Sequence, residues 1–259
     1  MDDREAIIRE IAKKKVRLVL PGMDVVPVRR NLKYRGDLLM DIYYPAVAAG
    51  QRAPVVHLSM GFPDPQSGIR SYGPYTSWAQ LIAASGMAAV VHGSDSPAES
   101  AAAALDYLRA HADALDLDVR RLALFSMSGS VPLALSLLMG ERSVACAALL
   151  SGYTMDLAGS TVVADTAAQH GFVNACAGKT VDDLPTGVPL FFVRAGRDQF
   201  PGVNDSLDAV VVGALARNLP VTLVNHADGA HGFDCDEDSN ISREIVRQLL
   251  AFLRFHLKA

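Results

Sequence analysis

Residues 122–133 read LALFSMSGSVPL, and this stretch decides how the chain folds. Its first four residues are apolar, as in a strand buried within a sheet. The apolar stretch Gly129–Met139 predicts a buried helix, and Pro132 fits its first turn, where proline is tolerated. The small residues Ser126–Ser130, here called the serine turn, therefore join a strand directly to a helix. Such a short connection is strained and pushes its central side chain, Ser128, out beyond the carboxyl end of the sheet.

Strands and helices are expected to alternate on both sides of the serine turn. The expected strands are Val25–Arg30, Leu38–Tyr44, Pro54–Ser59, Met87–His92, Leu122–Phe125, Val144–Leu150, Pro189–Val193 and Val221–Val224. The expected helices are 3–15, Ser77–Ser85, Ala98–Ala114, Gly129–Met139, Ser206–Asn218 and Ile241–His256.

The alternation from residue 54 onward predicts an α/β protein with a mainly parallel central sheet and helices on both faces. The first two strands, joined by a turn at Arg35–Asp37, are expected to be an antiparallel N-terminal addition. Residues 153–187 interrupt the alternation and are expected to form an excursion over the top of the sheet. We expect one domain over residues 1–259.

Composition limits the classes of function. Half of the 259 residues are hydrophobic, so a sizeable core is feasible, and a net charge of -4 does not favour nucleic-acid binding. No segment has the length of a membrane span, and the acidic N-terminus lacks a signal-peptide pattern. Cys146, Cys176 and Cys235 are odd in number and widely spaced, which argues against a disulfide framework. We therefore expect a cytoplasmic protein; the sequence does not predict its oligomeric state.

Ser128 is a candidate nucleophile. Small residues are needed two positions before and after such a residue because neighbouring backbone passes close by, and Ser126 and Ser130 meet that need. The helix that follows offers free N–H groups to a developing negative charge, so the amide of Gly129 is the expected oxyanion donor. An ordinary helix N-cap is the alternative, because serine is favoured there without any catalytic role.

A candidate acid and then a candidate base follow Ser128 along the chain. Asp198 comes just after the strand at Pro189–Val193, and His231 lies in the loop after the next strand. The carboxyl ends of successive parallel strands meet at one edge of a sheet, so these side chains can converge. His226 is a second candidate base, closer to its strand, and Asp205 is a less well placed acid that would cap the helix at Ser206.

The loop 59–62 is expected to give a second oxyanion donor. Gly61 allows close backbone approach, and the amides of Met60 and Phe62 are both candidates. The side chains of Phe62 and Tyr153 are expected to line a substrate pocket next to Gly61.

Four segments resemble the α/β-hydrolase family, and in particular its small esterases and dienelactone-hydrolase-like members. They are Leu39–Pro45 (LMDIYYP), the serine turn, Arg194–Asp198 (RAGRD) and His231–Phe233 (HGF). The resemblance spans most of the chain, about residues 38–257, and implies a Ser128–His231–Asp198 triad that cleaves esters or related acyl compounds. Serines replace the two glycines usual in the family's turn, and residues 59–62 read SMGF where many members have His-Gly-Gly.

The other patterns in the sequence give weaker predictions of function. His226, Asp228 and His231 match no common metal-ligand spacing, and no phosphate-binding glycine loop occurs, so neither a metal nor a cofactor is expected. Residues 93–96 follow a strand and either face the site or cap the next helix. The acidic residues of 234–238 are expected to be solvated. The alternative function is a hydrolase-fold protein that binds a small molecule without turning it over.

Overall fold

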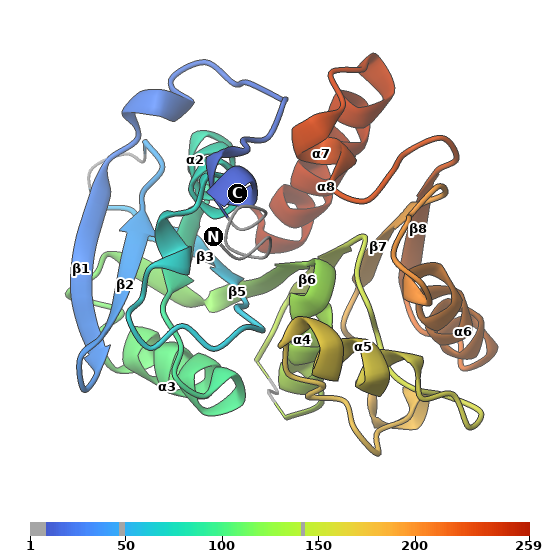
Figure 1. Ribbon diagram of the computed structural model, residues 1–259. Helices are drawn as coiled ribbons and strands as arrows, with labels where there is room; N and C mark the ends of the chain where they lie inside the picture. The colour runs from blue at the N-terminus through green and yellow to red at the C-terminus, as the bar shows by residue number, and fades with distance from the viewer. Residues whose placement is uncertain (1–8, 47–49, 141–142) are drawn as a thin grey trace.

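The computed structural model describes residues 9–46, 50–140 and 143–259 (Figure 1). Its centre is an eight-stranded sheet in the order β1-β2-β4-β3-β5-β6-β7-β8. The strands are β1 (Val28–Arg35), β2 (Leu38–Tyr43), β3 (Ala53–Leu58), β4 (Ala88–His92), β5 (Leu117–Met127), β6 (Cys146–Leu150), β7 (Leu190–Ala195) and β8 (Val221–His226). The α-helices are α2 (Gly73–Ala84), α3 (Pro97–Ala110), α4 (Val131–Gly140), α5 (Val162–His170), α6 (Val203–Ala216), α7 (Phe233–Asp236) and α8 (Asn240–Leu257). Short 3-10 turns cover Met23–Val25, Ile69–Ser71, Ser128–Ser130 and Val181–Asp183.

The sheet is parallel except at its N-terminal edge. Strands β3 to β8 pair in parallel, whereas β1 pairs with β2, and β2 with β4, in antiparallel register. This confirms the predicted mainly parallel sheet with an antiparallel N-terminal addition. All strands from β3 onward therefore point their carboxyl ends toward one edge, where the loops that carry polar residues gather.

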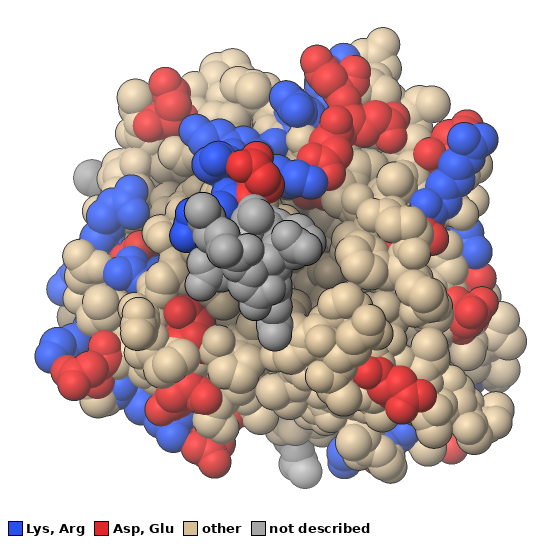
Figure 2. Space-filling view, in the orientation of Figure 1, with Lys and Arg blue, Asp and Glu red and all other residues tan. Residues whose placement is uncertain are grey.

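Helices cover both faces of the sheet, as predicted. Figure 1 shows α3, α4 and α6 below the sheet and α2 and α8 above it. The two cores follow the alternation of side chains along each strand, so that Val55 packs toward α3 and α4 and its neighbour Val56 toward α2 and α8. On the face shown in Figure 2, basic and acidic side chains are interspersed, and the area over α4 and α5 is mostly uncharged.

Several elements differ from their predicted limits. Strand β1 runs from Val28 to Arg35, because residues 23–25 form a 3-10 turn and the strand's outer positions are exposed polar residues without an apolar pattern. Helix α2 begins at Gly73 with proline in its first turn, four residues before the predicted start. Helix α3 ends at Ala110. Of the predicted helix 3–15, residues 9–13 are helical and 3–8 lie outside the described residues.

Candidate active site

The serine turn has the backbone that the sequence predicts. Ser128 follows β5 directly and has a φ of 54°, a left-handed conformation that non-glycine residues rarely adopt. Neighbouring loops press on the turn from two sides. A Cβ on Gly61 would lie 2.7 Å from the Cα of Ser130, and one on Gly152 would lie 2.4 Å from the carbonyl oxygen of Ser128. This crowding explains why Gly61 and Gly152 carry no side chain where they meet the turn.

The structure brings Ser128, His231 and Asp198 into one hydrogen-bonded line. The Oγ of Ser128 lies 2.8 Å from Nε2 of His231, and Nδ1 of His231 lies 2.7 Å from Oδ2 of Asp198. Asp198 follows β7 and His231 follows β8. A carboxylate only accepts hydrogen bonds, so Nδ1 carries the imidazole proton and Nε2 is free to accept the proton of Ser128.

The loops that carry the acid and the base are tied together by backbone hydrogen bonds. The amide of Gly196 donates to the carbonyl of His226 at 2.8 Å, and the amide of Arg197 donates to that of Gly229 at 2.9 Å. Within the first loop, the other carboxylate oxygen of Asp198 accepts from the amide of Phe200 at 2.9 Å. The Asp198 side chain is 1% exposed and that of His231 is 14% exposed. The Asp198 carboxylate is therefore shielded from water, whereas the His231 ring remains partly exposed.

Ser130 has a structural task that its place in the sequence does not reveal. Its Oγ accepts a hydrogen bond from the amide of Gly61 at 2.9 Å, and both residues are buried. The bond fixes the loop after β3 against the serine turn. The amide of Gly61 is thereby occupied, and the amides of its neighbours Met60 and Phe62 remain the candidates for a second oxyanion donor beside Gly129. The Met60 side chain is fully buried in the core.

Aromatic side chains pack beside the serine turn and the His231 ring. Tyr153, predicted to line the pocket, stacks on Phe172 with ring centroids 5.3 Å apart and donates its hydroxyl to the carbonyl of Pro201 at 3.1 Å. Phe62 meets Phe172 edge-on at 6.0 Å. Phe200 lies edge-on against the His231 ring at 4.8 Å. Phe172 lies within residues 153–187, the segment expected over the site, whereas Phe200 lies outside it; neither belongs to a motif that singles it out in the sequence.

The alternative base and acid lie elsewhere. His226, the last residue of β8, is 2% exposed, and its Nε2 lies 3.0 Å from the Oγ of Ser242 on α8. Helix α6 begins at Val203, so Asp205 lies inside its first turn, and the prediction that it caps a helix at Ser206 is wrong. Asp228 pairs with Arg197 at 2.5 Å on the surface. Within the described ranges, no three His, Cys, Asp or Glu side chains form a group that could hold a metal ion.

The acidic run 234–238 is only partly solvated, which corrects the prediction. Asp234 is 5% exposed and accepts a hydrogen bond from the indole Nε1 of Trp78 at 2.8 Å. Burial raises the pKa of this carboxyl, and the bond from Trp78 opposes that shift. Short helix α7 turns Asp234 inward between α2 and α8, whereas Asp236 remains outside, paired with Lys14.

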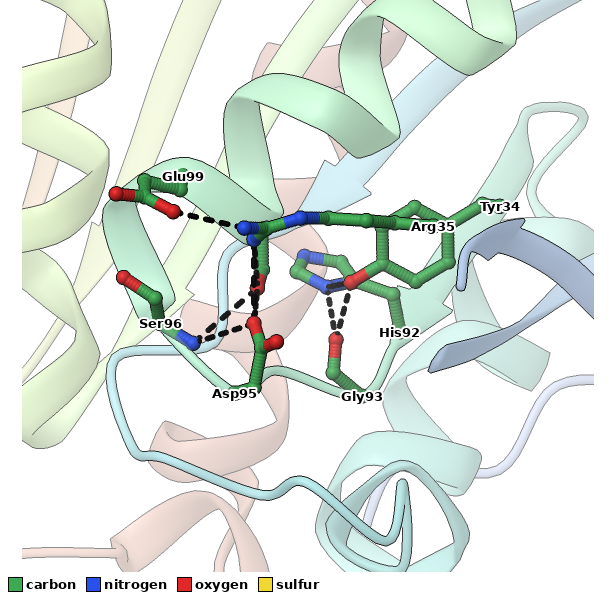
Figure 3. Close-up of polar contacts among 8 residues, drawn as sticks. Tyr34, Arg35, His92, Gly93, Asp95, Ser96 and Glu99 are labelled. Atoms are coloured by element: carbon green, nitrogen blue, oxygen red, sulfur yellow. Dashed lines mark hydrogen bonds and ion pairs between the residues drawn. The ribbon is translucent and has the colours of Figure 1, made fainter. Parts of the chain in front are cut away.

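Within residues 93–96, Asp95 and Ser96 lie at the start of α3, whereas Ser94 pairs with Asp64. Figure 3 shows Arg35 from β1 bonded to Asp95 at 3.1 Å and to Glu99 at 2.7 Å. The Oδ1 of Asp95 also accepts from the amide of Ser96, the N-cap residue of α3, at 2.7 Å. Beside this group, the hydroxyl of Tyr34 donates to the carbonyl of Gly93 at 2.6 Å, and burial raises the pKa of Tyr34 to about 12.

The cysteines do not supply a competing nucleophile. All three are buried and unpaired as disulfides, and burial raises the pKa of both Cys146 and Cys176 to about 12. A thiol with so high a pKa carries almost no thiolate at neutral pH.

In the described part of the chain, no helix is long and apolar enough to cross a membrane.

Comparison with known proteins identifies the fold. The sequence matches no protein-family model and no curated protein. Among solved structures, the chain is similar to a bacterial heroin esterase with a TM-score of 0.72 and 16% identity, covering 99% of this chain and 90% of that one. An esterase from Pseudomonas putida (TM-score 0.72, 16% identity, 98% and 89% covered) and fungal esterases from Rhizomucor miehei (TM-score 0.70, 16% identity, 98% and 90% covered) are also similar. The chain has the α/β-hydrolase fold.

Proposed function

We propose that this protein is a serine hydrolase that cleaves small carboxylic esters through an acyl-enzyme. The hydrogen-bonded line from Ser128 through His231 to Asp198 carries the proposal, with both distances below 3 Å. The strained, partly exposed position of Ser128 supports it, since a serine that only capped a helix would not need a φ of 54°. The esterase names of the structural neighbours agree with this reaction class.

Ser128, His231 and Asp198 have different roles in the proposed reaction. His231 takes the proton of Ser128 as Oγ attacks the ester carbonyl carbon, and the resulting oxyanion accepts hydrogen bonds from the amide of Gly129 and from Met60 or Phe62. Asp198 stabilises the imidazolium. His231 then delivers its proton to the leaving alcohol, and a water molecule, activated by the same base, releases the acid and regenerates Ser128.

A fluorophosphonate probe tests the nucleophile directly, because such probes phosphonylate only activated serines. We expect the folded wild-type protein to be labelled at Ser128 and Ser128→Ala to be unlabelled. Ser242→Ala is the matched control and should be labelled like the wild type, although Ser242 also lies beside a histidine. An unlabelled wild-type protein would favour the alternative, a hydrolase-fold protein that binds a small molecule without turnover.

We further propose that the substrate is a small acyl compound met in the cytoplasm.

A further inference from the structure

The wall beside the oxyanion site is formed by two phenyl rings. A Cβ placed on Gly129 would lie 2.8 Å from Cδ1 of Phe172 and 3.0 Å from Cζ of Phe62. The distance to Phe172 is shorter than real carbon contacts and the distance to Phe62 is tighter than most, so the two rings already rest against the backbone of Gly129. Glycine at position 129 leaves room for these rings and not for additional substrate.

The geometry of ester cleavage shows which part of a substrate meets this wall. In the tetrahedral intermediate, the leaving oxygen must face Nε2 of His231, because that nitrogen protonates it. The oxyanion must face the amide of Gly129. The acyl chain is the remaining substituent and points away from His231, toward the rings over Gly129. Phe200, which packs against the His231 ring, lies on the leaving-group side.

Phe172 is held firmly in this position. It is 5% exposed and stacks on Tyr153. The next residue, Val173, donates its amide to the carbonyl of Gly61 at 2.9 Å, which ties the segment after α5 to the loop after β3. The Asp156 carboxylate accepts from the amides of Val163 and Ala164 at 2.8 and 3.0 Å and so holds the start of α5. A ring fixed by stacking and by backbone bonds on both sides is a wall and not a flexible cover.

We propose that Phe172, together with Phe62, closes the acyl pocket and restricts the enzyme to acetyl and propionyl esters. This inference rests on the proposed function. Shortening Phe172 opens apolar space where additional methylene groups of a substrate can pack. A single methylene in a hydrophobic pocket changes kcat/KM by about 10-fold to 200-fold.

The test compares two series of esters. The acyl series is p-nitrophenyl acetate, butyrate and hexanoate, and the alcohol series is phenyl acetate and 1-naphthyl acetate. We expect the wild-type kcat/KM to fall at least about tenfold from acetate to hexanoate, and the hexanoate-to-acetate ratio of Phe172→Ala to rise at least about tenfold. Phe172→Ala should leave the ratio within the alcohol series unchanged, and Phe200→Ala should change only that ratio. Phe255→Ala, which removes an exposed phenyl ring on α8, is the matched control for both series.

Phe172→Leu covers the case in which the alanine variant does not fold, since it keeps apolar bulk but shortens the reach of the ring. It should raise the hexanoate-to-acetate ratio less than Phe172→Ala does. A wild-type preference for hexanoate, or a Phe172 variant that folds and shifts only the alcohol series, overturns the acyl-pocket proposal while leaving Ser128 labelled by fluorophosphonate. A protein that neither is labelled nor hydrolyses any of these esters overturns the proposed function itself, and the acyl pocket with it.

Discussion

Two serine–histidine–acid groups are built around histidines only five residues apart. The first joins Ser128, His231 and Asp198, and the second joins Ser242, His226 and Glu237. Both serine-to-Nε2 distances are short, 2.8 Å and 3.0 Å. A search for the three residue types close together would find both groups. They differ in which ring nitrogen meets the acid.

In the first group, the acid and the serine lie on opposite nitrogens of the ring. Asp198 holds the proton on Nδ1 and so leaves the lone pair of Nε2 for Ser128. In the second group, Glu237 lies 3.4 Å from Nε2 of His226, the nitrogen that also meets Ser242. A neutral ring that donates from Nε2 to the acid cannot accept the serine proton there.

The backbones of the two serines differ as well. Ser242 lies in the first turn of α8, where its amide donates to the Oγ of the N-cap residue Ser239 at 3.0 Å, and it is 1% exposed. Ser128 has a left-handed backbone and is partly exposed. The proposed proton transfer and substrate access therefore fit the first group, whereas the second joins the end of β8 to α8.

Replacing each of the two histidines by alanine should produce the largest difference in kcat. We expect His231→Ala to lower kcat for p-nitrophenyl acetate by up to about 10⁶-fold, down to the background rate, because Ser128 loses its base. His226→Ala should change kcat less than about threefold, although it lowers the melting temperature by removing a buried bond to Ser242. Steady-state kinetics at pH 7.5 measure both. Loss of activity in His226→Ala alone would assign the base to His226.

Replacing each of the two acids by its amide should give the next largest difference in kcat. In Asp198→Asn, the amide N–H₂ can donate to Nδ1, which places the imidazole proton on Nε2, the wrong nitrogen for Ser128. We expect kcat to fall about 10⁴-fold without loss of fold. Glu237→Gln is the matched control, and its kcat should stay at the wild-type value. Equal losses in both variants would show that acids act here through overall charge and not through the tautomer of His231.

The sequence predicts the sheet and the convergence of Ser128, Asp198 and His231 for one physical reason. Apolar runs of strand length are local signals, and the carboxyl ends of parallel strands converge without further information. The sequence favours His231 as the base and keeps His226 as an alternative, because the feature that separates them, which ring nitrogen meets which acid, depends on the packed structure.

Contacts between distant segments explain what the sequence did not predict. Trp78 and Asp234 are 156 positions apart, and only the packed structure turns this aspartate inward. Phe172 is likewise an ordinary apolar residue in sequence, and its contact with Gly129 depends on how residues 153–187 fold back over the serine turn.

Two further histidines extend the comparison to a fully buried environment. His57 on β3 and His92 on β4 stack with ring centroids 4.9 Å apart, and both are 0% exposed. Burial lowers the pKa of His92 to about 4 from 6.5 and lowers that of His57 as well. Unlike His231, neither ring has a carboxylate partner among the described residues that would stabilise a positive charge.

These depressed pKa values predict loss of stability in acid. Between pH 6.5 and pH 4, His92 binds a proton in the unfolded chain but not in the folded protein. The stabilising contribution of neutral His92 to the free energy of unfolding is therefore fully present above pH 6.5 and is lost as the pH falls toward 4. Over that interval the free energy of unfolding should fall by about 3 kcal/mol through His92 alone. Urea denaturation at pH 7 and pH 4 measures the change, and His92→Gln should reduce it by that amount. Identical pH dependence in both proteins would mean that His92 is protonated in the folded state.

Replacing the two serines on either side of Ser128, at positions 126 and 130, by alanine should give the smallest effects. The two changes in the free energy of unfolding should have opposite signs. Ser130→Ala leaves the buried amide of Gly61 without its acceptor and should lower the free energy of unfolding by about 1–3 kcal/mol. It should also lower kcat, because the loop that carries Met60 and Phe62 is no longer fixed against the turn. The hydroxyl of Ser126 is buried and has no hydrogen-bond partner among the described residues, so Ser126→Ala should raise stability by about 1 kcal/mol and keep kcat. Urea denaturation and p-nitrophenyl acetate hydrolysis of both variants test this. If Ser126→Ala lowered the stability instead, Ser126 would be the residue that supports the turn. The hydrogen bond from Gly61 to Ser130 would then not explain the serine at position 130.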